Sequence, residues 1–373
     1  MMEETGIQLG ELRESIRQVL DEHHQTRGDD IPGEDGRPLD KALWAQMTEL
    51  GWFGLGIGEE SGGLGLGAAH VAVLHEELGR SLASIPATTT LLAASLITLA
   101  GSPQQRADLL PRICRGELMV SMLLPSGYGG APAYGAEGLS ATYEHIPFAD
   151  SVDLFLLPFT QGDGGLAYAI LPAGTPGVVV ERRTVIDLTR HLGEVRLSGL
   201  DLDHGSIMPV TPEQLAVMRS HADIALASDA IGGAAAIFER TIEYLGVREQ
   251  FGRPVGSFQA LKHRAANWKV LLEASIALAR HAADAVASRE ADAEVLAASA
   301  KFYCCDVYAS LSGDAIQLHG GIGFTWEHPC HLFLKRAKLN QQMFGGSIEH
   351  KERVARLAFN PAAEPAPPSL IRN

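Results

Sequence analysis

The sequence has few positive charges, and this scarcity limits the partners it can bind. Its 373 residues include 30 Lys and Arg against 45 Asp and Glu, which gives a formal net charge of −15. A nucleic-acid backbone is bound by clustered Lys and Arg that release counterions, so this charge balance argues against a nucleic-acid partner. Long apolar runs are lacking as well. None reaches the roughly 18–20 residues that span a bilayer, so we expect no membrane span.

Cysteine is scarce and lacks the spacing of a metal or disulfide framework. Cys304 and Cys305 are adjacent inside a helical stretch, and Cys114 and Cys330 stand alone. This usage predicts a reducing, cytoplasmic protein without zinc or disulfides. The N-terminal stretch is acidic and amphipathic, unlike a cationic signal peptide.

The composition is ordinary for a globular protein, with 46% hydrophobic and 20% charged residues. The periodicity of the apolar residues divides the chain into segments. Residues 1–118 read as a helical domain. Residues 119–210 alternate short β-branched or aromatic runs with turn signals, which predicts an antiparallel β-barrel or sandwich. Residues 211–359 return to the helical period and predict a four-helix bundle, and 360–373 form a Pro-rich tail expected to be disordered. The bundle segments are Gln214–Leu245, Ser257–Arg289, Ala291–Leu311 and His350–Phe359. The fold class is therefore α+β and multidomain.

The stretch from Tyr244 to Trp268, YLGVREQFGRPVGSFQALKHRAANW, is the strongest candidate for a ligand site. Pro and Gly break a long helix here, and a second helix begins after the break. A guanidinium forks onto phosphate and an aromatic ring stacks on a planar ligand, so such a corner suits a planar ligand that carries phosphate. The alternative is a polar helical hairpin with a salt bridge. The candidate residues are Arg248, Gln250, Phe251, Phe258 and Gln259.

A second cluster, QLHGGIGFT, follows the third helix of the bundle. Gln317 and His319 offer side-chain donors and acceptors, and Gly320 and Gly321 let a ligand approach the backbone. Ordinary turn glycines after a helix end are the alternative. The two clusters in this order, within a helix–strand–helix layout, strengthen each other.

These motifs resemble those of the acyl-CoA dehydrogenase family, and the resemblance covers nearly the whole chain. REQFGRPVGSFQALKHR is similar to its first bundle signature, and QLHGGIGFTWEHP to its second. The resemblance implies FAD as cofactor, with the pyrophosphate and adenosine half of each site lent to a neighbouring protomer. It implies that Arg248 holds the pyrophosphate and that the other candidate residues surround the phosphates and adenosine.

The sequence departs from this family at the catalytic base. Members remove the substrate α-proton with a carboxylate while the flavin takes a hydride from the β-carbon. The expected Glu position is occupied by Gly345, and the alternative position used by some relatives falls near Ala222. Neither side chain accepts a proton. Asp223 and Glu349 remain as weak substitutes, because a base must first satisfy geometry.

The middle segment departs from the family as well. The piece that corresponds to the flavin-wrapping loop reads LLPSGYGG at 123–130, without Thr, Glu or Asp, and IPFA at 146–149 lies near the place of the usual Trp-Ile-Thr stretch. The half of a flavin site that faces the ring in this chain is therefore expected to lack its usual residues. The half that the chain lends to a neighbour's FAD is expected to be intact.

Three hypotheses follow from this asymmetry. The first is the base-less subunit of an α2β2 heterotetramer for α,β-dehydrogenation of an acyl-CoA, completing the FAD site of a catalytic acyl-CoA dehydrogenase subunit, as in heteromeric actinobacterial members that degrade steroid side chains or in fatty-acid β-oxidation. The second is a self-sufficient homo-oligomer with a non-standard base. The third is a scaffold subunit that takes no part in catalysis.

Overall fold

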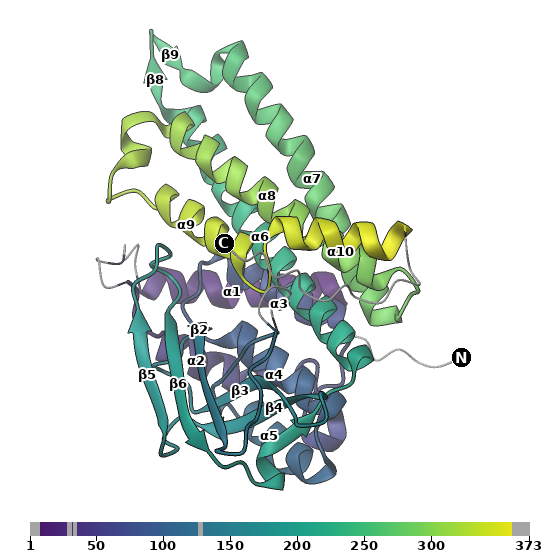
Figure 1. The fold of residues 1–373 in the computed structure, drawn as a ribbon. Coiled ribbons are helices and arrows are strands. Elements are labelled where there is room, and N and C mark those ends of the chain that lie inside the picture. Colours follow the sequence, from purple (N-terminus) through teal and green to yellow (C-terminus); the bar gives the residue numbers. More distant parts are fainter. Residues whose placement is uncertain (1–7, 28–31, 33–35, 126–129, 360–373) are drawn as a thin grey trace, which may run out of the picture.

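The computed structural model describes residues 8–27, 32, 36–125 and 130–359 (Figure 1). The 126–129 part of the predicted loop and the 360–373 tail lie outside this range. Helices and sheets form a broad base, and a bundle of long helices extends from it. Among the described residues, no helix is long and apolar enough to cross a membrane.

The first part of the described chain is helical, as its periodicity predicts. Its elements are α1 (Leu9–Arg27), α2 (Lys41–Glu49), α3 (Ala68–Arg80), α4 (Ala87–Ala100) and α5 (Pro103–Cys114), with short 3₁₀ turns at Trp52–Gly54 and Glu59–Ser61. Ser102 caps α5 in a capping box with Gln105, which satisfies backbone N–H groups at the helix start. Phe53 and Leu96 are fully buried in the core that these helices share.

The middle segment forms two sheets. The strands are β1 (Val120–Met122), β2 (Leu139–Pro147), β3 (Leu154–Thr160), β4 (Leu166–Pro172), β5 (Val178–Arg183), β6 (Leu192–Leu200) and β7 (Ile207–Pro209), with a 3₁₀ turn at His204–Ser206. One sheet has the order β1-β3-β4-β7 and the other β2-β6-β5. The predicted barrel is therefore not closed, and one pairing, β1 with β3, is parallel.

The residues of β3 explain why the strands form layers. Leu154 and Leu156 pack into the core of the N-terminal helices, whereas Phe155 and Leu157 pack into the core under the second sheet. Because successive side chains point to opposite faces, this strand needs a cover on both sides. The first sheet thus lies between helices and the second sheet.

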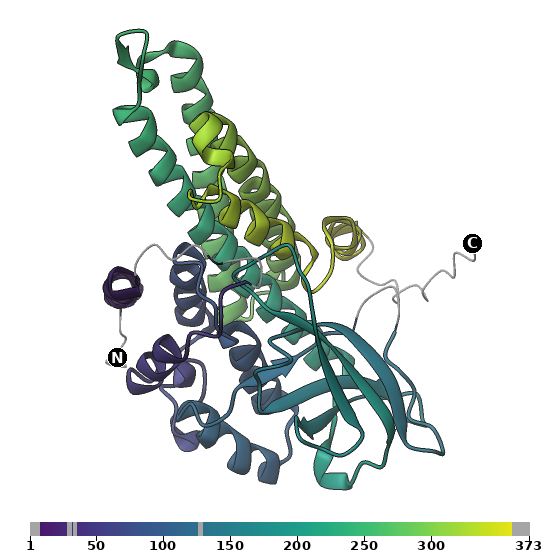
Figure 2. The ribbon, with the colours of Figure 1, turned by 90° about the vertical axis from the view of Figure 1, so that its left-hand side faces the viewer.

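The C-terminal segment is a bundle with one helix more than predicted. Its helices are α6 (Pro212–Val247), α7 (Gln259–Ser288), α8 (Ala293–His319), α9 (Cys330–Gln342) and α10 (Ser347–Phe359). Helix α8 runs eight residues beyond the predicted end at Leu311, and α9 was missed. Arg336 and Asn340 lie on the buried face of α9, so its apolar pattern is interrupted. Helix α10 lies across the bundle and is seen end-on in Figure 2.

A buried charge network joins the three parts of the molecule. Arg336 of α9 donates to Asp187 Oδ2 (2.9 Å), Asp229 Oδ2 (3.3 Å) and the carbonyl oxygen of Ala83 (3.0 Å). Arg190 also donates to Asp229 Oδ2, at 2.8 Å. These residues come from the N-terminal helices, the segment between β5 and β6, and the bundle. The network therefore fixes the bundle on its base, with each buried charge paired.

Candidate functional site

The first predicted cluster lies at the end of the bundle that is farthest from the sheets (Figure 1). Arg248 caps α6 in an extended conformation, and a small hairpin follows, β8 (Glu249–Gln250) paired with β9 (Arg253–Pro254). Phe251 and Gly252 form its turn, both with positive φ (54° and 75°). A 3₁₀ turn at Val255–Ser257 then leads to α7. The hairpin carries Arg248 and Gln250 into solvent, where both are exposed.

Sequence reasoning missed one arginine in this cluster. The Arg253 guanidinium lies 4.1 Å from the centroid of the Phe258 ring, in a cation–π contact. Phe251 meets the same ring edge-on, with centroids 6.1 Å apart. Gln259 begins α7 beside them and is exposed. The corner thus presents two exposed guanidinium groups, Arg248 and Arg253, and a ring held by neighbours, which suits a phosphate-bearing planar ligand.

The second predicted cluster lies at the same end of the bundle, where α8 ends (Figure 1). Gln317 is exposed in the last turn of α8, and Gly320 and Gly321 begin a 3₁₀ turn, Gly320–Phe324. Tyr244 ties this cluster to the first. Its hydroxyl donates to the carbonyl oxygen of His319 (3.1 Å), and its ring stacks on the His319 ring with centroids 4.5 Å apart.

The two glycines differ in what they require. Gly320 has a φ of +63°, which favours glycine for conformational reasons. Gly321 has no positive φ, and a Cβ built on it would have no heavy atom of the chain within 4 Å. Glycine costs conformational entropy, yet nothing within the chain requires its small size at Gly321. The space above this turn is open for a molecule from outside the chain.

Large apolar side chains are exposed around the two clusters. They are Phe251 (91% exposed), Phe324 (86%), Val247 (76%), Trp326 (54%) and Ile322 (47%). Apolar groups gathered at one end of a molecule mark an interaction surface. We call this set the distal apolar patch.

The position of the expected base lies in the turn between α9 and α10. Gly345 has a φ of +107°, which few residues other than glycine adopt. Its carbonyl oxygen accepts a hydrogen bond from the buried Lys301 ammonium, which also donates to the carbonyl oxygen of Gln341 at 3.1 Å. The turn is thus anchored to α8 without a carboxylate at this position.

Glu349 fills part of the space that a side chain on Gly345 would take. A Cβ built on Gly345 would lie 3.0 Å from Glu349 Oε2 and 3.0 Å from His350 Cε1. Burial lowers the pKa of Lys301 and of Arg219, and the charge of Glu349 offsets part of this lowering in both. Of the two substitute carboxylates predicted, Glu349 is the one adjacent to the expected position.

Asp223 is fully buried and engaged in hydrogen bonds. Its Oδ1 lies 2.8 Å from His350 Nε2, and its Oδ2 accepts from the Arg353 guanidinium. Burial alone would raise the pKa of Asp223, but the Arg353 charge and these hydrogen bonds together lower it below its usual value. A carboxylate held in its charged form by two partners from α10 is a poor proton acceptor, and its geometry is that of an anchor for that helix.

The alternative base position, Ala222, is fully buried in the apolar core. Its neighbour His221 lines a cavity of about 190 Å³ between α3, α4, α6 and the end of α7, where its Nδ1 lies 2.6 Å from Ser95 Oγ. Burial lowers the pKa of His221 to about 4, so the ring is neutral at physiological pH. The cavity is lined mainly by apolar side chains and holds no carboxylate.

The side chains of residues 146–149, near the expected flavin-facing stretch, are buried inside the chain. Ile146, Phe148 and Ala149 are buried in the core of the second sheet, and Phe148 stacks on His191 with centroids 5.1 Å apart. These side chains serve packing within the chain.

Comparisons with known proteins identify the family. Residues 8–117 match the model "Acyl-CoA dehydrogenase, N-terminal domain", and residues 209–358 match "Acyl-CoA dehydrogenase, C-terminal domain". The acyl-CoA dehydrogenase IpdE2 of Mycobacterium tuberculosis is 30% identical over 346 residues, 92% of this chain and 95% of that protein. The chain belongs to the acyl-CoA dehydrogenase family. FAD is the cofactor of this family.

Other members and solved structures are similar over most of the chain. Acyl-CoA dehydrogenase FadE27 of M. tuberculosis is 28% identical, covering 87% of this chain and 90% of that protein. The steroid ACAD Tcur3481-Tcur3483 matches with a TM-score of 0.83 and 29% identity over 95% of this chain and 99% of that one. The ChsE4-ChsE5 complex of M. tuberculosis has a TM-score of 0.85 at 24% identity, over 97% and 100% of the two chains.

Proposed function

We propose that this chain is the base-less subunit of a heteromeric, α2β2 acyl-CoA dehydrogenase. It lends Arg248, Gln250, Phe251, Phe258, Gln259, Gln317, Gly320 and Gly321 to the FAD site of a partner subunit. The partner, an acyl-CoA dehydrogenase subunit with Glu at the position corresponding to Gly345, supplies the proton-abstracting carboxylate and the substrate pocket. By itself this chain does not dehydrogenate an acyl-CoA.

The length of α6 carries the proposal. Asp223, bonded beside the Gly345 turn, and Val247, which precedes Arg248, lie 24 residues apart on this helix. At a rise of 1.5 Å per residue, this is about 36 Å, longer than an FAD molecule. One FAD is too short to join these two points, which supports a flavin that is held by Arg248 and carries out its chemistry in another chain. At this chain's own end, Gly345 offers no carboxylate.

The distal end supports a role in completing another chain's site. Contacts within the described chain explain neither the exposure of the distal apolar patch nor the choice of glycine at Gly321. A partner subunit over the patch and a phosphate chain against the turn would explain both. Two similar structures have names that pair two proteins, Tcur3481-Tcur3483 and ChsE4-ChsE5, and the second is a complex.

The residues of the distal end match the chemistry of the cofactor. The exposed Arg248 guanidinium binds the pyrophosphate, with Arg253 as a second cation, and Phe258 with the neighbouring amides of Gln250 and Gln259 borders the adenosine. When bound, FAD supplies the acceptor for the two electrons that leave the substrate. This chain's part is to hold its distal half and exclude water from it.

The substrate is proposed to be an acyl-CoA thioester, in steroid side-chain degradation or fatty-acid β-oxidation. The steroid pathway is supported by the 29% identity to the steroid ACAD Tcur3481-Tcur3483.

The test of the proposed function co-expresses this chain with acyl-CoA dehydrogenase subunits encoded near it. It measures co-purification, bound flavin absorbance and acyl-CoA dehydrogenation. We expect a yellow, active complex only with a partner. A yellow, active homo-oligomer would overturn the proposal.

Glu349 favours a second candidate, a self-sufficient homo-oligomeric dehydrogenase. Its carboxylate is adjacent to the expected base position, with Oε2 3.0 Å from the point that a Cβ on Gly345 would occupy. In this reading Glu349 accepts the α-proton. Glu349→Gln would then abolish dehydrogenation by the purified chain while leaving bound flavin unchanged, whereas the heteromeric proposal expects no activity to lose.

The third candidate, a scaffold that neither binds FAD nor affects catalysis, is separated by flavin content. Arg248→Ala within the complex is expected to lower the amount of bound FAD per complex. Arg112→Ala, which removes an exposed arginine on α5, is the matched control and should leave it unchanged. Equal flavin content in both variants would favour the scaffold.

A further inference from the structure

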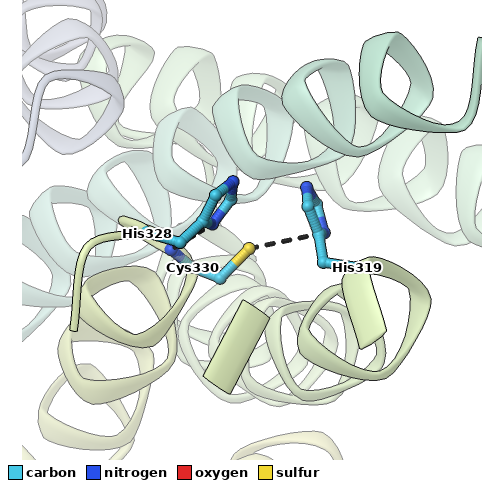
Figure 3. A group of neighbouring side chains, drawn as sticks. All are labelled: His319, His328 and Cys330. Carbon is cyan, nitrogen blue, oxygen red and sulfur yellow. Dashed lines mark hydrogen bonds between the residues drawn. The ribbon is translucent and has the colours of Figure 1, made fainter. Parts of the chain in front are cut away.

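Three side chains with metal-ligating atoms gather where α8 ends and α9 begins. His319 is the last residue of α8, Cys330 is the first of α9, and His328 precedes it in the connection. One ligand atom from each lies within 4.8 Å of the others. Cys330 Sγ is 3.4 Å from His319 Nδ1, and the two imidazole centroids are 4.6 Å apart. Figure 3 shows the sulfur between the two rings.

One nitrogen of this cluster is buried without a hydrogen-bond partner. His319 is only 2% exposed, and its Nε2 bonds to nothing in the described chain. Its Nδ1 lies 2.8 Å from the carbonyl oxygen of Ala315, to which it donates. A neutral ring that donates from Nδ1 keeps its lone pair on Nε2. A backbone carbonyl bond of this kind also orients the histidines that bind metals.

His328 and Cys330 complete the cluster, and a backbone hydrogen bond links them. His328 Nδ1 accepts only a long bond, 3.3 Å, from the backbone N–H of Cys330. Coordination by the Cys330 sulfur requires the thiol to lose its proton to solvent when an ion binds.

The donor set selects the class of ion. Two imidazole nitrogens and a thiolate suit zinc, whereas Mg²⁺ and Ca²⁺ prefer oxygen. Zinc bonds of about 2.3 Å to sulfur and 2.0–2.1 Å to nitrogen in a tetrahedron place two ligand atoms roughly 3.6 Å apart. One ligand atom from each of the three side chains already lies within 4.8 Å of the others with no ion bound. Three protein ligands leave a fourth position for water.

We propose that His319, His328 and Cys330 bind one Zn²⁺ ion that clamps the connection between α8 and α9. Binding forms a zinc–sulfur bond and releases the thiol proton to solvent, with no change in oxidation state. The ligands flank the turn that contains Gly320 and Gly321, so the ion restrains that turn at both ends. The single-cysteine spacing, with eight residues between the histidines, is unlike the usual paired-cysteine zinc motifs, which is why sequence analysis predicted no zinc.

The experiment measures zinc in the full-length, tag-free chain by mass spectrometry after incubation with ZnSO₄ and desalting. We expect about one zinc per chain, and its loss in Cys330→Ser and in His328→Gln. Cys114→Ser is the matched control, since Cys114 lies in the N-terminal helices and its removal should leave the zinc content unchanged. Zinc content far below one per chain, or content unaffected by Cys330→Ser, would overturn the proposal.

Two further readouts do not depend on flavin. Co²⁺ in place of zinc should give a thiolate-to-cobalt charge-transfer absorption that Cys330→Ser removes. Zinc should also slow amide hydrogen exchange across residues 320–329 in the wild-type chain and leave it unchanged in Cys330→Ser. Exchange that is insensitive to zinc, when zinc is bound, would refute the clamp while leaving the site in place.

Discussion

Glu349 Oε2 lies 3.0 Å from the point that a Cβ on Gly345 would occupy. The position at which a catalytic carboxylate is expected is therefore closed twice, by a backbone φ of +107° and by a neighbouring carboxylate. Placing a carboxylate at Gly345 requires more than one substitution, because both the backbone φ and Glu349 oppose a side chain there.

Substitution of Gly345 tests this closure. Gly345→Ala is expected to lower the free energy of unfolding by about 1–3 kcal/mol, because alanine is strained at this φ and its Cβ meets Glu349. Urea unfolding measures the change. Adding Glu349→Ala should recover part of the loss, since it removes the contact but leaves the backbone strain. Gly346→Ala is the control: its nearest contact would be an ordinary 3.6 Å, and a loss as large as that of Gly345→Ala would contradict the explanation.

The buried network predicts a large stability effect at Arg336. Arg336→Met leaves Asp187 and Asp229 buried without this partner, and we expect a loss of about 3–5 kcal/mol in the free energy of unfolding. Arg115→Met, which removes an exposed ion pair with Glu117, should change it little. Thermal and urea unfolding of both variants provide the comparison. Similar stabilities would show that the network is not needed to hold the bundle on its base.

Two buried histidines predict how stability depends on pH. Burial lowers the pKa of His75 and of His221 to about 4 each, from an ordinary value of 6.5. Between these values the unfolded chain binds protons that the folded chain does not, so stability falls as pH decreases from about 7 to 4. Each histidine should contribute about 2 kcal/mol of this loss between pH 7 and pH 5.

Urea unfolding at both pH values measures this contribution. His221→Gln should reduce the difference in stability between pH 7 and pH 5, whatever its effect at pH 7. His263→Gln, at an exposed position on α7, is the control and should leave the difference unchanged. A His221→Gln protein with the same pH dependence as the wild type would contradict the assignment.

The distal apolar patch predicts a surface effect without a folding effect. Phe251→Ser and Phe324→Ser should leave the unfolding midpoint of the chain unchanged, because both side chains are largely exposed. Each should weaken co-purification with a partner subunit, measured by the yield of complex from co-expression. Ile186→Ser, at a position 62% exposed in the segment between β5 and β6, is the matched control. Weakening by all three alike would indicate general destabilisation.

Predictions from the sequence succeeded where apolar periodicity is regular. The N-terminal segment is helical as predicted, with α1 amphipathic along Leu12, Ile16 and Leu20, and the family recognised from the two bundle motifs is confirmed. Helix α9 was missed because Arg336 and Asn340 occupy its buried face, where their partners come from distant segments. Arg253 was not named as a ligand candidate because its stacking on Phe258 depends on the 3₁₀ turn at Val255–Ser257 between them.

The sequence by itself determined the family, the helix-rich layout and the absence of a carboxylate at Gly345, because these depend on residue identity and local order. Tertiary structure decided which remaining groups could act. It bonded Asp223 to α10, set Glu349 beside Gly345, and gathered His319, His328 and Cys330 into one cluster. Such proximity arises from how helices pack, and the spacing of residues along the chain does not encode it.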